Sequence, residues 1–447
     1  MKSEITKEEL ASFEKGYDAD PKSNALRHAL AKSKFEDVIF SLDEKADVDY
    51  SFSIDLPMLP VSDQKRSGRC WIFSASTILR EIIAKKLNIK GQFEISQNYI
   101  SYFDKLEKAN FAFEGVIDLA LKGEKPGDRK IDHLLHEPIS DGGQWDMYAD
   151  LVKKYGVVPK AVFPETAQSN GTAKSTQLLS SLVRQFARDV YAINGKLDRS
   201  VLEEKKASYL TKVYAILTDC FGKVPTSFTF SYTDKENKYH RIDKTTPLAF
   251  FNTYVGEEID QYVSLIDAPT KDKKVYQTYH VELVGNVIGG KPVTHLNVPY
   301  EELEKNIIAQ LKAGYPVWFG SDVSYYGDRD GGLWDTNAFD YKSAFDCDLA
   351  FNKADMLTYL ESAMNHAMVI CGVDLDENGK PTRWKIENSW GKENGKDGFY
   401  IMSEAFFTTF VYQAAIRQEF LSEKEKEGLK TKPVLLAPWD PFGTLAD

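Results

Sequence analysis

The sequence has 447 residues, of which 43% are hydrophobic, 13% aromatic and 28% charged. This composition is typical of a folded globular chain and excludes extensive disorder. The net charge of −11 disfavours binding to nucleic acid, and residues 171–300 hold nearly balanced numbers of basic and acidic side chains. We therefore expect no nucleic-acid partner.

The four cysteines are few and scattered, which fits a reducing compartment better than a disulfide framework. They are Cys70, Cys220, Cys347 and Cys371. No cysteine and histidine cluster has the spacing of a zinc site, and we expect neither a metal nor another cofactor. The charged start lacks the apolar core of a signal peptide. The sequence also contains no run of about 18 apolar residues, which is the length needed to span a membrane. These features predict a cytoplasmic protein without a membrane partner.

The first third of the sequence predicts an amphipathic start, an extended connection and a helix that begins near Cys70. Two prolines near the end of residues 1–60 bar a helix there, and Gly68 ends the polar loop that follows. The apolar residues from this point recur close to helical spacing: Trp71, Ala75, Ile78, Leu79, Ile82, Ile83 and Leu87. Residues 138–145 contain paired glycines and predict a turn.

The remainder of the sequence predicts helices followed by β-hairpins. Residues 175–221 have the pattern of two helices broken near Asn194-Gly195. The later elements are expected as strands at 227–232 and 239–242, a helix at 301–311, and strands at 315–321, 367–373, 383–388 and 398–402. Three prolines in residues 433–447 exclude a regular helix and predict an extended tail.

Cys70, at a helix N-terminus, is a candidate nucleophile. A free thiol has a pKa of about 8.5, which a helix N-terminus and an imidazolium together lower to about 3–4 in papain-like sites. His366 is the candidate base, and the side-chain amide of Asn388 is the candidate that holds the imidazole in one orientation. Gln64 is placed to offer its amide hydrogens to an oxyanion beside the backbone N–H of Cys70.

Four motifs that include these residues resemble, in order and in composition, those of the papain family of cysteine peptidases. They are Gln64-x-x-x-Gly68-x-Cys70-Trp71, Asp141-Gly142-Gly143, Asn365-His366-Ala367 and Asn388-Ser389-Trp390-Gly391. The resemblance implies an α+β, papain-like two-lobed fold, with a helical lobe and an antiparallel β-barrel-like lobe. It also implies that Gly142 and Gly143 pair with the substrate backbone and that Trp390 shields the bond between the asparagine and the histidine from water.

The sequence departs from the family pattern beside the nucleophile. In secreted members, the positions of Ser67 and Ser140 hold two cysteines that form a disulfide. Both halves of that bridge are absent here, as an intracellular enzyme requires. Arg69 replaces the usual small residue before the nucleophile, and the sequence offers no explanation for it.

The spacing of the motifs predicts an inserted domain. His366 and Asn388 follow Cys70 by roughly 300 residues, which is about 150 more than in ordinary members. We therefore expect five parts in chain order: an N-terminal extension (1–60), a helical lobe with the nucleophile (61–165), a mostly helical insertion (166–300), a β lobe with the histidine and the asparagine (301–432), and a C-terminal tail (433–447).

This arrangement, with the closing sequence PWDPFGTLAD, resembles the bleomycin hydrolase / aminopeptidase C branch of the family over essentially the whole chain. The branch implies a cysteine aminopeptidase that acts on peptides and assembles as a homohexamer with active sites facing an inner channel. It implies that the tail lies in the active-site cleft, where its terminal carboxylate meets the free α-amino group of the substrate. Either Ala446 or Asp447 would supply that carboxylate.

Several alternatives stay open from the sequence. An open-cleft cysteine endopeptidase would have no use for such a tail, and a binding protein that kept the scaffold would be free to lose any one catalytic residue. A transglutaminase-like acyl transferase usually orients its histidine with an aspartate. Taken singly, Cys70 and His366 could be inert core residues, the paired glycines only a turn, and the tail a docking strand at a subunit contact.

Overall fold

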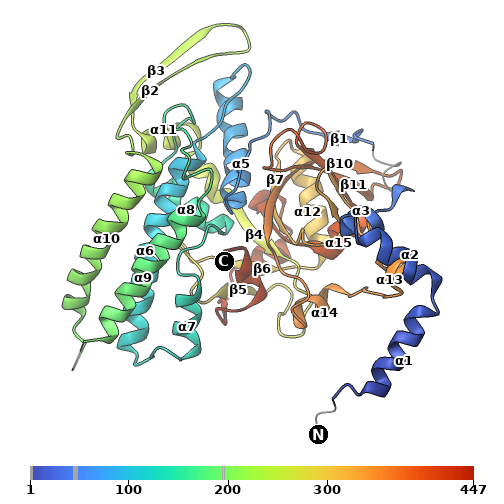
Figure 1. Cartoon of the computed structure of the whole chain (residues 1–447). Coiled ribbons are helices and arrows are strands. Elements are labelled where there is room, and N and C mark those ends of the chain that lie inside the picture. Colours follow the sequence, from blue (N-terminus) through green and yellow to red (C-terminus); the bar gives the residue numbers. More distant parts are fainter. Residues whose placement is uncertain (1–3, 44–48, 194, 196, 447) are drawn as a thin grey trace.

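The computed structural model describes residues 4–43, 49–193, 195 and 197–446. Helices gather on one side of the molecule and a large sheet on the other, with helix α5 (Cys70–Leu87) between them (Figure 1). Each side has a hydrophobic core of its own, and α5 belongs to the helical one. The chain therefore folds into two lobes that meet beside the helix that Cys70 begins.

The helical side is built from long helices that bury their apolar residues against one another. They are α6 (Gln97–Leu121), α7 (Arg129–His136), α8 (Trp145–Tyr155), α9 (Ala173–Tyr191), α10 (Arg199–Phe221) and α11 (Pro247–Tyr254), followed by the 3₁₀ helix η1 (Gly256–Gln261). The break between α9 and α10 falls where the sequence predicts it. A hairpin of β2 (Phe228–Thr233) and β3 (Tyr239–Thr245), also predicted, extends from this side.

The other side is a sheet of 12 strands in the order β14-β5-β6-β4-β13-β7-β10-β11-β12-β9-β8, with β1 paired to β10. Its strands are β1 (Ile54–Asp55), β4 (Tyr262–Ile266), β5 (Thr278–Val281), β6 (His295–Asn297), β7 (Val317–Ser321), β8 (Gly327–Asp328), β9 (Leu333–Trp334), β10 (His366–Leu375), β11 (Pro381–Glu387), β12 (Phe399–Ser403), β13 (Val411–Arg417) and β14 (Val434–Leu436). The central pairs β7–β10, β10–β11 and β11–β12 are antiparallel, which confirms the predicted hairpins.

Further short helices surround the sheet. They are α12 (Tyr300–Lys312), which confirms the predicted helix there, α13 (Tyr341–Phe345), α14 (Lys353–Thr358), α15 (Glu404–Phe410), the 3₁₀ helix η2 (Gln418–Phe420) and α16 (Glu423–Gly428). At the start of the chain lie α1 (Lys7–Asp18), α2 (Pro21–Leu30) and α3 (Phe35–Ile39). Neither α1 nor α2 buries a residue, whereas Ile39 of α3 is buried in a third, small cluster with residues such as Leu333 and Phe339.

Two features differ from the expectations drawn from sequence. Strands β4, β5 and β6 fall within residues 166–300, which were expected to be a mostly helical insertion, yet they pair in the large sheet. The tail is not extended throughout, because it forms strand β14 and then the 3₁₀ helix η3 (Pro441–Ala446). Proline at the first position of a short helical turn is permitted because that position needs no N–H donor.

Candidate active site

Cys70 is the first residue of α5, as the sequence predicts. Its side chain is buried, and the backbone N–H of Ala367 lies 3.4 Å from its Sγ atom. The Ala367 N–H and the free N–H groups at the start of the helix favour a thiolate. Cys70 thus lies where the helical lobe meets the start of strand β10 in the sheet lobe.

Burial raises the pKa of the Cys70 thiol, whereas the helix N-terminus lowers it. Burial raises the pKa of Cys70 to about 11, although the backbone hydrogen bonds from Ala367, Trp71 and Cys70 itself partly lower it. Burial also lowers the pKa of His366 to about 4, although the hydrogen bond that the imidazole donates to Asn388 partly raises it. Both groups are therefore neutral near pH 7 in this conformation, in contrast with the low thiol pKa expected from the sequence.

His366 and Asn388 meet because they lie at one end of two adjacent strands. His366 begins β10, and Asn388 directly follows the last residue of β11, which pairs with β10 in antiparallel register. The Nε2 atom of His366 lies 2.9 Å from the Oδ1 atom of Asn388. The Asn388 Oδ1 atom also accepts the backbone N–H of Ser389, 2.8 Å away, which fixes the amide. The imidazole is therefore held through Nε2.

An aromatic side chain covers the imidazole, and a cationic side chain lies over that aromatic ring. The Trp390 indole stacks on the His366 ring, with centroids 4.7 Å apart and planes inclined by 24°. The guanidinium of Arg329 lies 4.2 Å from the centroid of Trp390, on the scale of a cation–π contact. Sequence reasoning had not singled out Arg329, whose position after β8 carries no recognisable motif. His366 is 5% exposed, and the positive charge of Arg329 adds to burial in lowering the pKa of its imidazole.

Gln64 is buried next to the asparagine motif. Its Nε2 atom donates to the carbonyl oxygen of Ser67 at 2.6 Å, and its Oε1 atom accepts the Ser389 hydroxyl at 2.5 Å. The backbone N–H of Gln64 also donates to the carbonyl of Ser389 at 2.8 Å. The bond to Ser67 uses one of the two amide hydrogens, so the amide has one more hydrogen to offer.

The paired glycines contact the chain's own tail. The backbone N–H of Gly143 donates to the carbonyl oxygen of Leu445 at 2.7 Å. A Cβ atom at Gly143 would overlap the indole of Trp71, so this position has no room for a side chain. The carbonyl oxygen of Gly142 accepts a hydrogen bond from the buried ammonium group of Lys108.

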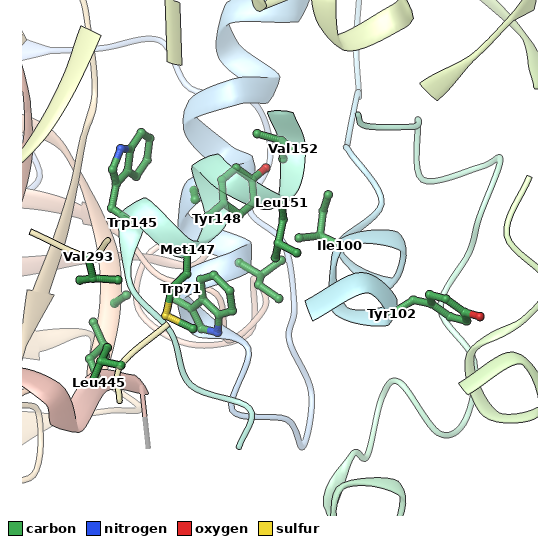
Figure 2. Close-up of a cluster of buried hydrophobic side chains, with 14 of the residues drawn as sticks. Trp71, Ile100, Tyr102, Trp145, Met147, Tyr148, Leu151, Val152, Val293 and Leu445 are labelled. Carbon is green, nitrogen blue, oxygen red and sulfur yellow. The ribbon is translucent and has the colours of Figure 1, made fainter. Parts of the chain in front are cut away.

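The tail is anchored along its length on both lobes. Upstream, the Asp440 carboxylate lies 2.8 Å from the Nζ atom of Lys273, and the Thr444 hydroxyl donates to the carbonyl of Met364 at 2.9 Å. The Leu445 side chain is buried in the helical-side core, at the edge of the cluster that contains Trp71 (Figure 2).

The end of the described tail contacts the segment that precedes the paired glycines. The hydroxyl of Ser140 donates to the carbonyl oxygen of Ala446 at 2.5 Å. Asp447 and its terminal carboxylate lie outside the described residues. Of the two residues named for the carboxylate, the structure therefore places only Ala446.

Charged residues that the sequence analysis did not single out brace the loops around Cys70. The Nζ atom of Lys105 lies 2.5 Å from the Asp141 carboxylate, which also accepts the backbone N–H of Gly68 at 3.0 Å. Burial opposes ionisation of Asp141, yet Lys105 holds the pKa of this carboxyl well below its ordinary value. These contacts tie the nucleophile loop to the double-glycine loop without a disulfide.

Arg69 has a structural role that its sequence context did not reveal. Its guanidinium is buried, with an Nη2 atom 3.0 Å from the Glu165 carboxylate, and its Nε atom donates to the Ser67 hydroxyl at 2.9 Å. Because the partner lies far along the chain, no local pattern could have indicated this ion pair. The ion pair with Glu165 and the hydrogen bond to Ser67 thus fix Arg69, the residue just before Cys70.

The part of the chain that the structure describes contains neither a cluster of metal-ligand side chains nor a helix that could span a membrane. No cluster of at least three histidine, cysteine, aspartate or glutamate side chains is arranged to bind a metal ion among these residues. Likewise, no described helix combines the length and apolarity needed to cross a bilayer.

Residues 4–443 match the model of the Peptidase C1-like family. The chain belongs to this family. Aminopeptidase C of Lactobacillus delbrueckii subsp. lactis is 43% identical over 452 aligned residues, which cover 100% of this chain and 99% of that relative. Aminopeptidase C of Listeria innocua serovar 6a is 37% identical over 100% of both chains.

The fold of this Peptidase C1-like chain also matches a solved structure. The crystal structure of pepw from Lactobacillus rhamnosis HN001 superposes with a TM-score of 0.95, at 42% sequence identity, over 99% of both chains. These findings confirm the α+β papain-like fold and the resemblance to the aminopeptidase C branch. The chain is a cysteine-type peptidase.

Proposed function

We propose that this chain is a cysteine aminopeptidase that releases N-terminal amino acids from peptides. The observation that carries the proposal is the hydrogen bond from the Gly143 N–H to the carbonyl of Leu445. It means that the chain's own backbone occupies the position at which the family resemblance expects substrate backbone. Relatives named aminopeptidase C, similar over their full length, support the same activity.

In the proposed first half-reaction, His366 takes the proton of the Cys70 thiol through Nδ1, since Nε2 is held by Asn388. The sulfur attacks the first peptide carbonyl, and the C–S bond forms as the carbonyl electron pair moves to oxygen. The second amide hydrogen of Gln64 and the Cys70 N–H are the proposed donors to this oxyanion. The C–N bond then breaks, and the imidazolium gives its proton to the leaving amine.

In the second half-reaction, His366 takes a proton from water, and the hydroxide attacks the thioester carbonyl. The C–S bond breaks, the amino acid leaves, and the proton on His366 returns to the sulfur. The proposed role of Trp390 is to keep bulk water from the bond between His366 and Asn388, which fits its stacking on the ring. No metal or organic cofactor has a step in this cycle.

The tail is the proposed determinant of selectivity for free N-termini. It approaches from residue 440 and is anchored on both lobes, at Met364 and at Gly143. A peptide that extended upstream of its scissile bond would need the space that Leu445 and Ala446 fill. The terminal carboxylate, at Asp447 or at a trimmed Ala446, is proposed to attract the substrate's α-ammonium group.

The alternative of an open-cleft endopeptidase is less well supported, because these tail contacts would obstruct substrate on the upstream side. A scaffold used only for binding would have no need of the bond between His366 and Asn388. We further propose a homohexamer on the strength of the family resemblance, and a cytoplasmic location from the few, scattered cysteines of the sequence. Sedimentation that gives a stable monomer would overturn the hexamer.

The test uses two fluorogenic peptides that differ only in a free or an acetylated amino terminus, with and without a thiol alkylator. Alkylator-sensitive hydrolysis of the free peptide alone is the expected result. Equal hydrolysis of both peptides would point to an endopeptidase, and hydrolysis of neither would favour the binding scaffold.

A further inference from the structure

Ser140 occupies a distinctive place in this site. It stands where secreted papain-like enzymes have a disulfide cysteine, and its hydroxyl donates to the carbonyl of Ala446 at 2.5 Å. Among the described residues, this is the only hydrogen bond that the tail makes to the rest of the protein beyond Leu445. The Ser140 hydroxyl, at the position of a disulfide cysteine in the secreted enzymes, therefore binds the end of the described tail.

The direction of the Ser140 hydroxyl is set by Lys108 of α6. The buried Nζ atom of Lys108 lies 3.2 Å from the Ser140 Oγ atom, 3.1 Å from the Ser140 carbonyl oxygen and 3.2 Å from the Asp104 carboxylate. It also donates to the carbonyl oxygen of Gly142. The two carbonyls and the carboxylate can only accept, so they require the hydrogens of a charged ammonium group.

An ammonium group offers no lone pair, so Ser140 cannot donate its hydrogen to Lys108. The two carbonyls and the carboxylate take up the three ammonium hydrogens, so the Oγ atom at most shares one of them, and its own single hydrogen is left for the carbonyl of Ala446. Lys108 thus prevents the Ser140 hydroxyl from donating toward α6 and leaves it as a donor to the tail. A fixed donor costs less entropy on binding its acceptor than a freely rotating hydroxyl does.

We propose that Ser140, oriented by Lys108, is the positioning residue that fixes the end of the tail and so sets the selectivity for a free amino terminus. This inference rests on the proposed role of the tail. Ser140 contacts the tail rather than the reacting atoms, so its loss should alter the choice of substrate more than the chemical step.

The surrounding contacts make Ser140 suitable for substitution. The neighbouring Asp141 is held by Lys105 and by the N–H of Gly68, and the Ser140 carbonyl keeps its bond to Lys108. Ser140→Ala therefore removes the hydroxyl and leaves the loop in place. Ser140→Thr keeps a hydroxyl and serves as the conservative rescue.

The experiment measures kcat/KM for the free and the acetylated peptide in the full-length enzyme. Ser140→Ala is expected to lower the ratio of the two values by about five- to tenfold, which is the scale of one net hydrogen bond. Ser140→Thr should retain the ratio. Ser53→Ala is the matched control, because Ser53 donates to the carbonyl of Val373 at 3.1 Å, at the far end of β10.

The same variants are then made in a chain that lacks residues 444–447. There Ser140→Ala should have no further effect, because its acceptor is gone. An equal effect in both backgrounds, or an unchanged ratio in the full chain, would overturn the assignment of Ser140. If removal of the tail alone leaves the ratio unchanged, the proposed tail function itself fails, which separates the two ideas.

Discussion

Arg80 and Glu387 form a buried ion pair that links helix α5, which begins at Cys70, to the strand that leads to Asn388. The Nη2 atom of Arg80 lies 2.8 and 3.0 Å from the two carboxylate oxygens of Glu387. Arg80 also donates to the carbonyl oxygens of Leu59 and Pro60. One guanidinium therefore joins three segments that surround the site.

Breaking this pair should be costly. Arg80→Met or Glu387→Gln is expected to lower the free energy of unfolding by about 3–5 kcal/mol, because each leaves a buried group without its partner. The double variant Arg80→Met/Glu387→Met should lose less than the sum of the two single losses. Denaturant unfolding gives the values, and single losses below about 1 kcal/mol would contradict the expectation.

Replacement of the proposed nucleophile should separate activity from folding. Cys70→Ala is expected to abolish turnover while the melting temperature stays close to that of the parent chain, since the change removes one buried sulfur atom. Cys347→Ser is the control, because Cys347 is exposed and should be dispensable. Substantial activity in Cys70→Ala would place the nucleophile elsewhere.

The stacking of Trp390 on His366 predicts a change in the pH profile. A base must be neutral, so activity should fall as the pH drops through the pKa of His366, which burial lowers to about 4. Trp390→Ala exposes the ring, moves its pKa toward the ordinary value of 6.5 and shifts the acid limb of kcat/KM to higher pH by about one unit or more. An unmoved acid limb would mean that Trp390 does not set this pKa.

The burial of Cys70 predicts slow alkylation at neutral pH. Because burial raises the pKa of this thiol to about 11, the iodoacetamide reaction of the full chain should accelerate with pH across the neutral and alkaline range. Removal of residues 444–447 should admit water and make the reaction faster at pH 7. A rate that is independent of pH from about 5 to 8 would instead indicate a preformed ion pair with His366.

The close approach of Gly143 to Trp71 predicts intolerance to a side chain. Gly143→Ala would place a methyl group against the indole and is expected to cost about 1–3 kcal/mol of stability. It should also weaken the contact with Leu445 and reduce discrimination between free and acetylated peptides. Gly171→Ala is the control, since the nearest atom to its added Cβ would be 3.8 Å away. Equal stability losses in both variants would contradict the steric argument.

Much of this architecture could be predicted because local signals specify it. The apolar spacing after Cys70 placed the start of α5, and alternating strands placed β10 and β11, whose ends carry His366 and Asn388. The order of the motifs then supplied the family. Each motif and each predicted element depends on residues that are close together in the sequence.

Other features depend on contacts between distant residues and carried no such signal. Strands β4 and β6 are short and pair in parallel through a long connection, so their place in the sheet could not be predicted from the sequence. Lys105 and Lys108 resemble the charged face of a helix in the sequence, but both are buried against the 140–142 loop. Arg69 was unexplained until its distant partner Glu165 was known.

The covalent tethering of the tail has a consequence for how occupancy of the site depends on protein concentration. A separate inhibitor dissociates from its enzyme when both are diluted. A tethered segment instead keeps the same effective concentration, on the order of millimolar for a short flexible link. Since β14 pairs with β5 and holds the base of the tail, its free length is short. Occupancy of the site by the tail should therefore be the same in a dilute as in a concentrated solution, and the proposed selectivity would be a property of the single chain.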